Sequence, residues 1–509
     1  MAAKDQTGDH SKTNQRTVVF FHPDLGIGGA ERLIVDAAVG LQEQGNRVTI
    51  FTSHCDPNHC FEEARDGTLD VRVRGNTLFP PTFLGRFHIL LATLRQIHLV
   101  FSIAVWSNEL DRLKPDAFVV DQLSVCVPLL RWLYPRTLRT LFYCHFPDQL
   151  LADRRASGLM GLLKKLYRYP FDWFEGWSMS ASDRTVVNSE FTKSVASRVW
   201  PNLSASLGVI YPCVDFDDTG SQVDAKEGPL WEGQFKIILS INRFERKKDI
   251  GLAIRAYHNL DNGARQNTRL IIAGGYDHRI AENVGYHKEL VTMADEFGLS
   301  SATAKTVPTA LGIPRDIQIL FLLSVPGSFK ETLLDNAQLL LYTPSNEHFG
   351  IVPVEAMQHE LPVLASNNGG PLETIVEGET GWLRDASKVE DWSAVIQHVL
   401  NELSSAELRR IGRNGRERVR QRFTRRTMAK KLNDEITGML RNKRSVFVER
   451  KDIILGIWVV AAFAAALFAT IIKARCGRGD RRASEFARAR RMHAGPREGL
   501  KILPNDYNR

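Results

Sequence analysis

The sequence predicts an α/β protein with two doubly wound domains in series, followed by a helix that enters a membrane. Short β-branched runs alternate with helical patterns along most of the 509 residues, and such alternation is typical of parallel sheets covered by helices. The alternation stops once, at a stretch rich in Asp, Gly and Pro, and then begins again. A long apolar run without any charge follows near the carboxyl terminus.

The first predicted domain spans residues 17–214 and follows a polar leader, residues 1–16, that is expected to be disordered. A Gly-rich turn and the helical pattern AERLIVDAAVGL come directly after its first strand. Its strands are expected at 17–21, 47–52, 117–121, 138–145 and 184–189.

The second predicted domain spans residues 236–440, and residues 215–235 form the linker. Ligands of such folds bind outside the carboxyl ends of the strands, so two domains that face each other would form a cleft between those ends. Its strands are expected at 236–243, 269–275, 317–322, 339–345 and 362–367.

The membrane segment is expected at Ile453–Ile472, twenty residues without a charge. At 1.5 Å per residue this run is about 30 Å long, close to the thickness of a hydrocarbon core. Charged flanks favour a membrane helix over a buried core helix. Because Lys and Arg lie at both ends, the orientation stays open, and a re-entrant helix is an alternative to a spanning one.

The positive charge of the chain is concentrated after this segment. The basic tail, residues 473–509, holds eleven Lys or Arg and four Asp or Glu, and so carries seven of the eight net charges. A tail of this kind beside a membrane favours anionic lipid headgroups over nucleic acid. Two further stretches, Phe87–Trp106 and Gly158–Trp177, are apolar but interrupted by charges. They are expected to be interfacial helices, with packing on the protein core as the alternative.

Glycine-rich turns follow one strand in each domain. Gly28 and Gly29 precede the first helix, and Gly369 and Gly370 precede Pro371 at a predicted helix start. Backbone amides at a helix N-terminus favour an anion. Glycines in such turns are also compatible with a purely structural role.

Cationic and imidazole side chains are expected at other strand ends. Arg243 and Lys248 leave the first strand of the second domain in NRFERKKD, where their charges suit phosphate oxygens. A solvated charge run is the alternative. His145 ends a strand in FYCHFPDQ and is expected to point toward the same cleft, although a structural histidine has the same pattern.

Two glutamates, Glu347 and Glu355, are separated by seven residues in SNEHFGIVPVEAM. Such carboxylates can grip sugar hydroxyls, hold a metal, act in acid/base chemistry, or be unrelated surface residues. The string DFD (215–217) has the form of an Asp-x-Asp metal motif, but it lies at the domain joint, so no metal site is expected.

Taken together, these stretches resemble the family-four retaining glycosyltransferases over roughly residues 15–440. The E-x7-E spacing, NRFERKKD and GGAER are marks of that family. The strings GGAERLIVDAA, YCHFPDQLL and EHFGIVPVEAM are most similar to mannosyltransferases of the dolichol-linked oligosaccharide pathway that form alpha-1,3 and alpha-1,6 linkages.

The resemblance implies a GT-B fold of two facing Rossmann-like domains, the first binding the acceptor and the second the sugar nucleotide. It implies GDP-mannose as donor and Man-GlcNAc2-diphosphodolichol as acceptor. Two mannoses would be added, one alpha-1,3 and one alpha-1,6, in either order. GDP-mannose is then a substrate, and neither a cofactor nor a metal is required.

The resemblance also implies roles for individual residues. Arg243 and Lys248 would hold the donor diphosphate, Glu347 would contact the mannose and Glu355 the ribose. With His145 at the sugar, the expected catalytic residues are Glu347, His145, Arg243 and Lys248. The expected donor site also contains Gly28, Gly29, Phe349, Gly350, Ile351, Glu355, Gly369 and Gly370.

The pathway and the absence of a signal peptide imply an endoplasmic reticulum membrane protein whose catalytic domains face the cytosol. Other mannosyltransferases of the pathway are candidate partners, and no nucleic acid is expected. One alternative is a glycosyltransferase of this fold that uses another nucleotide sugar. Another is a catalytically silent membrane scaffold, which the presence of Arg243, Lys248 and Glu347 disfavours.

Overall fold

The computed structural model describes residues 15–80, 88–134, 138–151, 158–216, 230–233 and 235–442, all within one compact unit, residues 1–448. Three predicted features lie wholly or largely outside the described residues. They are the leader, the membrane segment 453–472 and the basic tail 473–509. Most of the predicted linker lies outside them as well.

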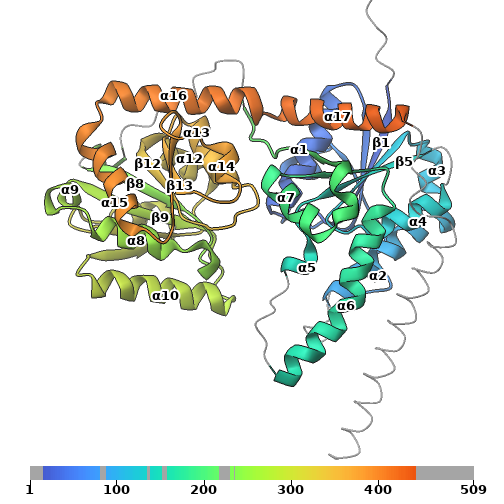
Figure 1. Ribbon diagram of the computed structural model, residues 1–509, viewed down its shortest axis with the longest axis horizontal. Coiled ribbons are helices and arrows are strands. Elements are labelled where there is room, and N and C mark those ends of the chain that lie inside the picture. The colour runs from blue at the N-terminus through green and yellow to red at the C-terminus, as the bar shows by residue number, and fades with distance from the viewer. Residues whose placement is uncertain are drawn as a thin grey trace, which may run out of the picture. The chain divides into compact units, whose positions relative to one another are not determined.

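The first domain is built on a parallel seven-stranded sheet in the order β3-β2-β1-β4-β5-β6-β7 (Figure 1). The central strands are largely apolar with polar residues near their ends, as expected for a sheet that helices cover on both faces. The strands are β1 (Thr17–Asp24), β2 (Arg47–His54), β3 (Asp70–Val73), β4 (Ala117–Asp121), β5 (Arg139–Cys144), β6 (Arg184–Val187) and β7 (Leu207–Val209).

Helices cover this sheet from both sides. The buried side chains of α1 lie in one apolar core, and those of α2, α4 and α7 lie in the other. The helices are α1 (Gly29–Glu43), α2 (His88–Phe101), α3 (Glu109–Leu113), α4 (Cys126–Leu133), α5 (Asp148–Leu151), α6 (Gly158–Ser180) and α7 (Glu190–Val199). Shorter turns are η1 (Glu62–Ala64), η2 (Ser102–Trp106) and η3 (Pro201–Ser206).

The second domain repeats the architecture with a parallel sheet in the order β10-β11-β9-β8-β12-β13-β14. Neighbouring residues Ile237 and Ile238 of β8 enter cores on opposite faces, as the two-residue period of a strand requires. The strands are β8 (Lys236–Ile241), β9 (Thr268–Gly274), β10 (Ser301–Ala304), β11 (Ile319–Leu323), β12 (Ala337–Tyr342), β13 (Val363–Ser366) and β14 (Gly381–Arg384).

One face of the second sheet packs against α8, α10 and α15, and the other against α12 and α13, while α16 contributes Ile411 to the first core and Val419 to the second. The helices are α8 (Ile250–His258), α9 (Asn262–Gln266), α10 (Ala281–Glu296), α11 (Val307–Leu311), α12 (Gly327–Asn336), α13 (Ile351–Gln358), α14 (Pro371–Thr374), α15 (Val389–Gln397) and α16 (Ser405–Arg422). Shorter turns are η4 (Leu230–Gly233), η5 (Arg246–Lys248) and η6 (His398–Glu402). The predicted architecture of two doubly wound α/β domains is thus confirmed.

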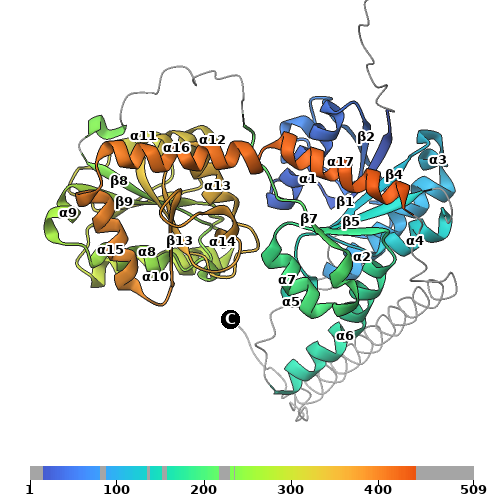
Figure 2. The same ribbon diagram turned by 45° about the horizontal axis from the view of Figure 1, so that its top comes forward.

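The last described helix, α17 (Arg425–Arg441), returns to the first domain. Figures 1 and 2 show it lying along α1. Met428, Leu432, Ile436 and Met439 form one apolar stripe and lie in the same core as α1. Residues 425–440, which the sequence places with the second domain, therefore complete the core of the first.

The apolar stretch 87–106 forms α2 and η2. Within the described residues, Ile89–Trp106 is the one helix long and apolar enough to cross a membrane by length and composition. Leu99, Val100 and Ile103 are nevertheless buried in the core of the first domain, so α2 packs as a core helix. The side chains of the first ten residues of α6 lie outside the described part, so its predicted interfacial role stays a prediction.

Candidate active site

The order of the strands marks one position in each domain where a ligand is expected. All strands are parallel, but the side of the sheet on which successive strands are added reverses between β1 and β4 in the first sheet, and between β8 and β12 in the second. Crevices at the carboxyl ends of strands at such switch points are the usual ligand sites of open α/β sheets. The predicted site residues follow β1, β5, β8, β12 and β13.

Lys248 and Glu347 meet at the switch point of the second sheet. The Lys248 Nζ lies 2.5 Å from Glu347 Oε2, and the two side chains are 17% and 22% exposed. The Thr343 hydroxyl donates to the Lys248 carbonyl at 2.7 Å, which fixes the loop that carries the lysine. Burial alone would raise the pKa of Glu347, but the adjacent Lys248 outweighs it, so the pKa is lowered and the carboxylate is ionised.

Gly369 and Gly370 hold the backbone of the Glu347 loop. The Gly370 amide donates to the Glu347 carbonyl at 2.8 Å. Gly369 has a φ of +67°, and a Cβ there would lie 2.5 Å from the Glu347 carbonyl oxygen. A Cβ on Gly370 would overlap the backbone of Phe349. These glycines therefore allow two loops to pack backbone against backbone, a structural role that the sequence left open.

Glu355 lies in α13 with a different cation. The Lys330 Nζ of α12 is 2.9 Å from Glu355 Oε1. The buried Tyr342 lies near both glutamates, and burial together with Glu347 and Glu355 raises its pKa well above the usual value. The two carboxylates of the E-x7-E motif are therefore ion-paired with different lysines, Glu347 with Lys248 and Glu355 with Lys330.

The remaining residues of this motif shape its backbone. Phe349 is 4% exposed and packs with its ring centroid 5.7 Å from that of Phe423, so its side chain belongs to the core. Gly350 has a φ of +80° and precedes α13, and a Cβ there would lie 3.1 Å from the Tyr342 ring. Ile351 is the first residue of α13.

His145 belongs to a buried array at the carboxyl ends of β1, β4 and β5. The Asp121 carboxylate lies 2.8 Å from His22 Nδ1 and 3.1 Å from His145 Nε2. His22 and Asp121 are at most 1% exposed, while His145 is 20% exposed. Burial alone would lower the pKa of His22, but Asp121 raises it. The two imidazoles in turn hold the pKa of Asp121 below its usual value against the effect of burial.

His348, next to Glu347, contacts the segment that follows β5. Its ring stacks on Phe146 with centroids 3.7 Å apart and planes 5° apart. Its carbonyl accepts a hydrogen bond from the Ser189 hydroxyl at 2.5 Å. Burial is the main cause that lowers the pKa of His348 to about 4. Residues of the first and second domains therefore touch beside both His145 and Glu347.

Arg243, Gly28 and Gly29 are among the predicted residues that have no described contact with the Lys248–Glu347 pair. Arg243 is 64% exposed, and its guanidinium lies 3.9 Å from the Glu245 carboxylate. Gly28 precedes α1, and the carboxylate of Glu31 occupies the direction in which its Cβ would point. A Cβ on Gly29 would meet nothing within 4 Å.

Sequence reasoning missed His22, Asp121, Lys330 and His348. Asp121 ends a strand in AFVVD and His22 ends one in VVFFH, so a polar residue at the end of an apolar run was the available signal. Nothing in the sequence pattern joins Lys330 to Glu355, because the two lie on different helices.

No metal-binding group appears among the described residues, where no three His, Cys, Asp or Glu side chains are suitably clustered. Asp215 of the DFD string instead accepts a hydrogen bond from Arg425. The expectation that no metal is required stays a prediction.

Solved structures share this fold at low sequence identity. A sucrose-phosphate synthase from Thermosynechococcus elongatus aligns with a TM-score of 0.59 at 18% identity, covering 84% of this chain and 99% of that one. A glycosyltransferase from Rickettsia africae aligns with a TM-score of 0.60 at 15% identity, covering 84% and 100%. These matches support the GT-B-like architecture that the resemblance implied.

Family profiles and relatives extend the match to sequence. Residues 27–218 match "Glycosyltransferase Family 4" and residues 222–418 match "Glycosyl transferases group 1". The alpha-1,3/1,6-mannosyltransferase alg-2 of Neurospora crassa is 56% identical over 84% of this chain and 91% of its own length. The ALG2 mannosyltransferase of Saccharomyces cerevisiae is 46% identical over 85% and 87%. The chain therefore belongs to the ALG2 family of alpha-1,3/1,6-mannosyltransferases.

Proposed function

We propose that this enzyme transfers mannose from GDP-mannose to Man-GlcNAc2-diphosphodolichol, adding one alpha-1,3 and one alpha-1,6 mannose to give Man3GlcNAc2-diphosphodolichol. Family membership supports the reaction class. The observation that carries the proposal for this chain is the Lys248–Glu347 ion pair at the switch point of the second sheet. The pair supports the proposal because an ammonium and an ionised carboxylate lie together at the position where open α/β sheets usually bind ligands.

The proposed chemistry follows from charge. As the bond between C1 of mannose and the phosphate oxygen breaks, its electron pair leaves with GDP and the sugar becomes oxocarbenium-like. Lys248 and Arg243 stabilise the charge that gathers on the diphosphate. The acceptor hydroxyl attacks C1 from the same face and gives its proton to the departing phosphate oxygen, so the configuration is retained. No cofactor or metal takes part in this proposal.

Glu347 and Glu355 have separate proposed roles. Glu347 is ionised beside Lys248, so it can accept a hydrogen bond from a mannose hydroxyl. Glu355 has the same acceptor capacity for the ribose hydroxyls, with Lys330 holding its orientation. His145 would contact the sugar from the first domain, where Asp121 orients its ring.

The proposed cellular location of the enzyme follows from the lipid anchor of its acceptor. A glycan on a polyprenyl diphosphate stays at a bilayer, so an enzyme held at the endoplasmic reticulum membrane, with its catalytic domains in the cytosol, meets it at a higher effective concentration. Other mannosyltransferases of the pathway are proposed neighbours at that membrane.

A purified full-length enzyme should test the proposal. We expect GDP-mannose and the lipid-linked monomannosyl acceptor to give trimannosyl product whose new linkages map as alpha-1,3 and alpha-1,6. Lys248→Ala should lower the transfer rate by about 100-fold or more, because it removes the charge beside the leaving group. Lys247→Ala is the matched control, since Lys247 is 72% exposed on the same turn.

Two outcomes would contradict this assignment. Equal transfer from a UDP-sugar would remove GDP-mannose as the specific donor. A wild-type rate in Lys248→Ala would remove the lysine from the diphosphate site, whereas a loss as large in Lys247→Ala would point to a general disturbance of the loop.

A further inference from the structure

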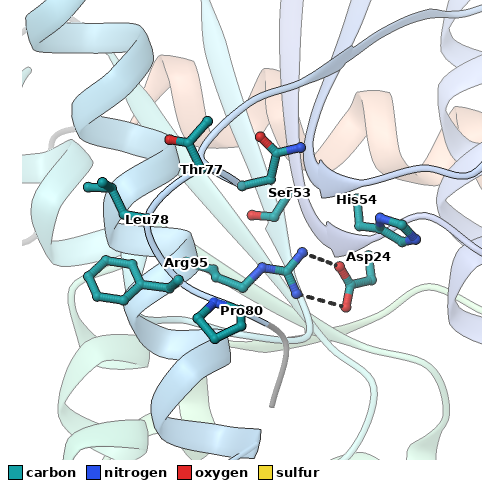
Figure 3. A pocket seen from close by; sticks show the side chains of 9 residues that line it. Asp24, Ser53, His54, Thr77, Leu78, Pro80 and Arg95 are labelled. Atoms are coloured by element: carbon teal, nitrogen blue, oxygen red, sulfur yellow. Dashed lines mark hydrogen bonds and ion pairs between the residues drawn. The ribbon is translucent and has the colours of Figure 1, made fainter. Parts of the chain in front are cut away.

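A cavity of about 570 Å³ opens at the carboxyl ends of β1 and β2 (Figure 3). Its lining includes Asp24 at the end of β1, Ser53 in β2, and a loop that contains Asn76 and Leu78. Ligand pockets for small molecules are about 300–1,000 Å³, so the volume is sufficient for a bound molecule. None of the residues assigned above to the donor or to catalysis lines it.

Two side chains of opposite charge in the cavity wall, Arg95 and Asp24, neutralise each other. Arg95 of α2 donates from both guanidinium nitrogens to Asp24, at 2.9 and 3.4 Å, as the dashed lines in Figure 3 show. Arg95 is 8% exposed and Asp24 is 52% exposed. Because the carboxylate already neutralises the guanidinium, the wall offers hydrogen-bonding groups with little net charge. Such a wall suits a neutral hydroxylated ligand better than a phosphate.

Uncharged polar groups also face the cavity. Asn76 and Thr77 line it, and both residues are exposed. The Asn76 amide can donate and accept hydrogen bonds, and the Thr77 hydroxyl can do the same. Both groups can therefore bond to hydroxyls of a ligand, whereas the Ser53 hydroxyl is buried away from the cavity.

The remaining wall is apolar. Leu78 is 60% exposed, and Phe79 and Pro80 line the cavity beside it. A pyranose ring carries hydroxyls at its edge and C–H groups on its faces. The polar side formed by Asn76 and Asp24 and the apolar side formed by Leu78 match these two surfaces.

The cavity also adjoins the histidine array. The Asp24 carbonyl lies 3.0 Å from His22 Nε2, and His22 contacts Asp121, which contacts His145. Three strand spacings separate β2 from β5, or about 14 Å at 4.7–4.9 Å each. A molecule that occupies the cavity and reaches His145 must therefore be longer than one sugar ring.

We infer that this cavity is a subsite for the acceptor glycan, and that it holds neutral sugar residues other than the one receiving mannose. The inference rests on the proposed function for the identity of the glycan. It assigns Leu78 and Asn76 to the recognition of the acceptor, and no part of the donor.

Binding of the free glycan tests the subsite without any transfer. The probe is Man-GlcNAc2 lacking lipid and diphosphate, mixed with the full-length enzyme in nanodiscs without a donor, and followed by saturation-transfer NMR. We expect Leu78→Ala and Asn76→Ala to weaken binding about tenfold, the loss of one good contact. Both side chains are exposed, so neither change threatens the fold. Leu311→Ala, at a leucine 44% exposed in the second domain, is the matched control.

Kinetics separate this inference from the proposed function. We expect the two variants to raise KM for the lipid-linked acceptor about tenfold while KM for GDP-mannose stays at the wild-type value. Inorganic diphosphate should bind wild type and variants alike. Unchanged glycan binding in both variants would overturn the subsite, as would a selective loss of diphosphate binding. A wild-type enzyme that binds the glycan but transfers no mannose would overturn the proposed function instead.

Discussion

At the residue scale, Glu347 and His348 are neighbours in different charge states, although burial disfavours the charged form of both. The ammonium of Lys248 keeps the carboxylate ionised, whereas burial and the adjacent Lys248 and Lys247 keep the imidazole neutral. A neutral His348 can stack flat on Phe146 without bringing another positive charge next to the lysines. The charge of the site at neutral pH therefore depends on keeping His348 unprotonated.

This state predicts loss of stability in acid. The pKa of His348 is about 4 in the folded protein, against an ordinary value of 6.5, so the unfolded chain binds the proton first as the pH falls. Above pH 6.5, His348 is neutral in both states and does not reduce the free energy of unfolding. As the pH falls from 6.5 toward 4, protonation of the unfolded chain lowers that free energy by at most about 3 kcal/mol. We expect His348→Phe, which keeps the ring stack, to reduce the fall in thermal midpoint between pH 7 and 4.5.

The control is a histidine on the surface. His278 is 82% exposed, and His278→Phe should reproduce the wild-type dependence of thermal midpoint on pH. Identical curves for wild type and His348→Phe would show that His348 does not contribute to acid lability.

At the scale of elements, the loop after β13 supports the loop after β12. Gly370 and Gly369 lie against the backbone of Phe349 and Glu347, with no space for a Cβ. Because the obstructing atoms are backbone, they cannot rotate away as a flexible side chain would. The position of Glu347 therefore depends on glycines about twenty residues away in sequence.

Gly370→Ala should displace the Glu347 loop and lower the transfer rate by about 100-fold, as removing a charge-stabilising group does. Gly438→Ala is the control, because a Cβ there meets nothing within 4 Å in α17 and alanine favours a helix by up to about 1 kcal/mol. Assay of both variants at equal protein concentration, with thermal midpoints, checks this. Wild-type activity in Gly370→Ala would show that the loops can separate without consequence.

The elements also show what the sequence could and could not predict. Strands that are buried on both faces, such as β1 and β8, were predictable because they read as unbroken apolar runs. The edge strands β3, β7, β10 and β14 were missed, since each is short and its apolar residues are few or interrupted by Gly or polar residues.

The residues of the candidate site also include some that the sequence could predict and some that it could not. Lys248 and Glu347 were predictable from their motifs at strand ends, and the structure places them in contact. The contact between His22 and Asp121 was not, because it joins residues 99 positions apart through strand pairing. Pairings of that kind depend on the strand order of the sheet, which periodicity does not determine.

At the scale of the whole molecule, the chain crosses from the second domain back to the first. Helix α17 supplies Leu432 and Ile436 to the core of the first domain. Its close approach needs Gly40 in α1, where a Cβ would lie 2.6 Å from that of Ala429. Arg184 also binds Glu435 at 2.7 Å. The first domain therefore depends on residues encoded more than 200 positions after its last strand.

This dependence predicts a selective effect of Leu432→Ala in the full chain. Leu432 is 2% exposed, and truncating a buried leucine destabilises by about 2–5 kcal/mol. Hydrogen exchange should become faster in α1 and β1, whereas β8 and β12 of the second sheet keep wild-type protection. Leu311→Ala, at an exposed leucine, should leave both sheets unchanged. Equal acceleration in both sheets, or none in α1, would show that α17 does not belong to the core of the first domain.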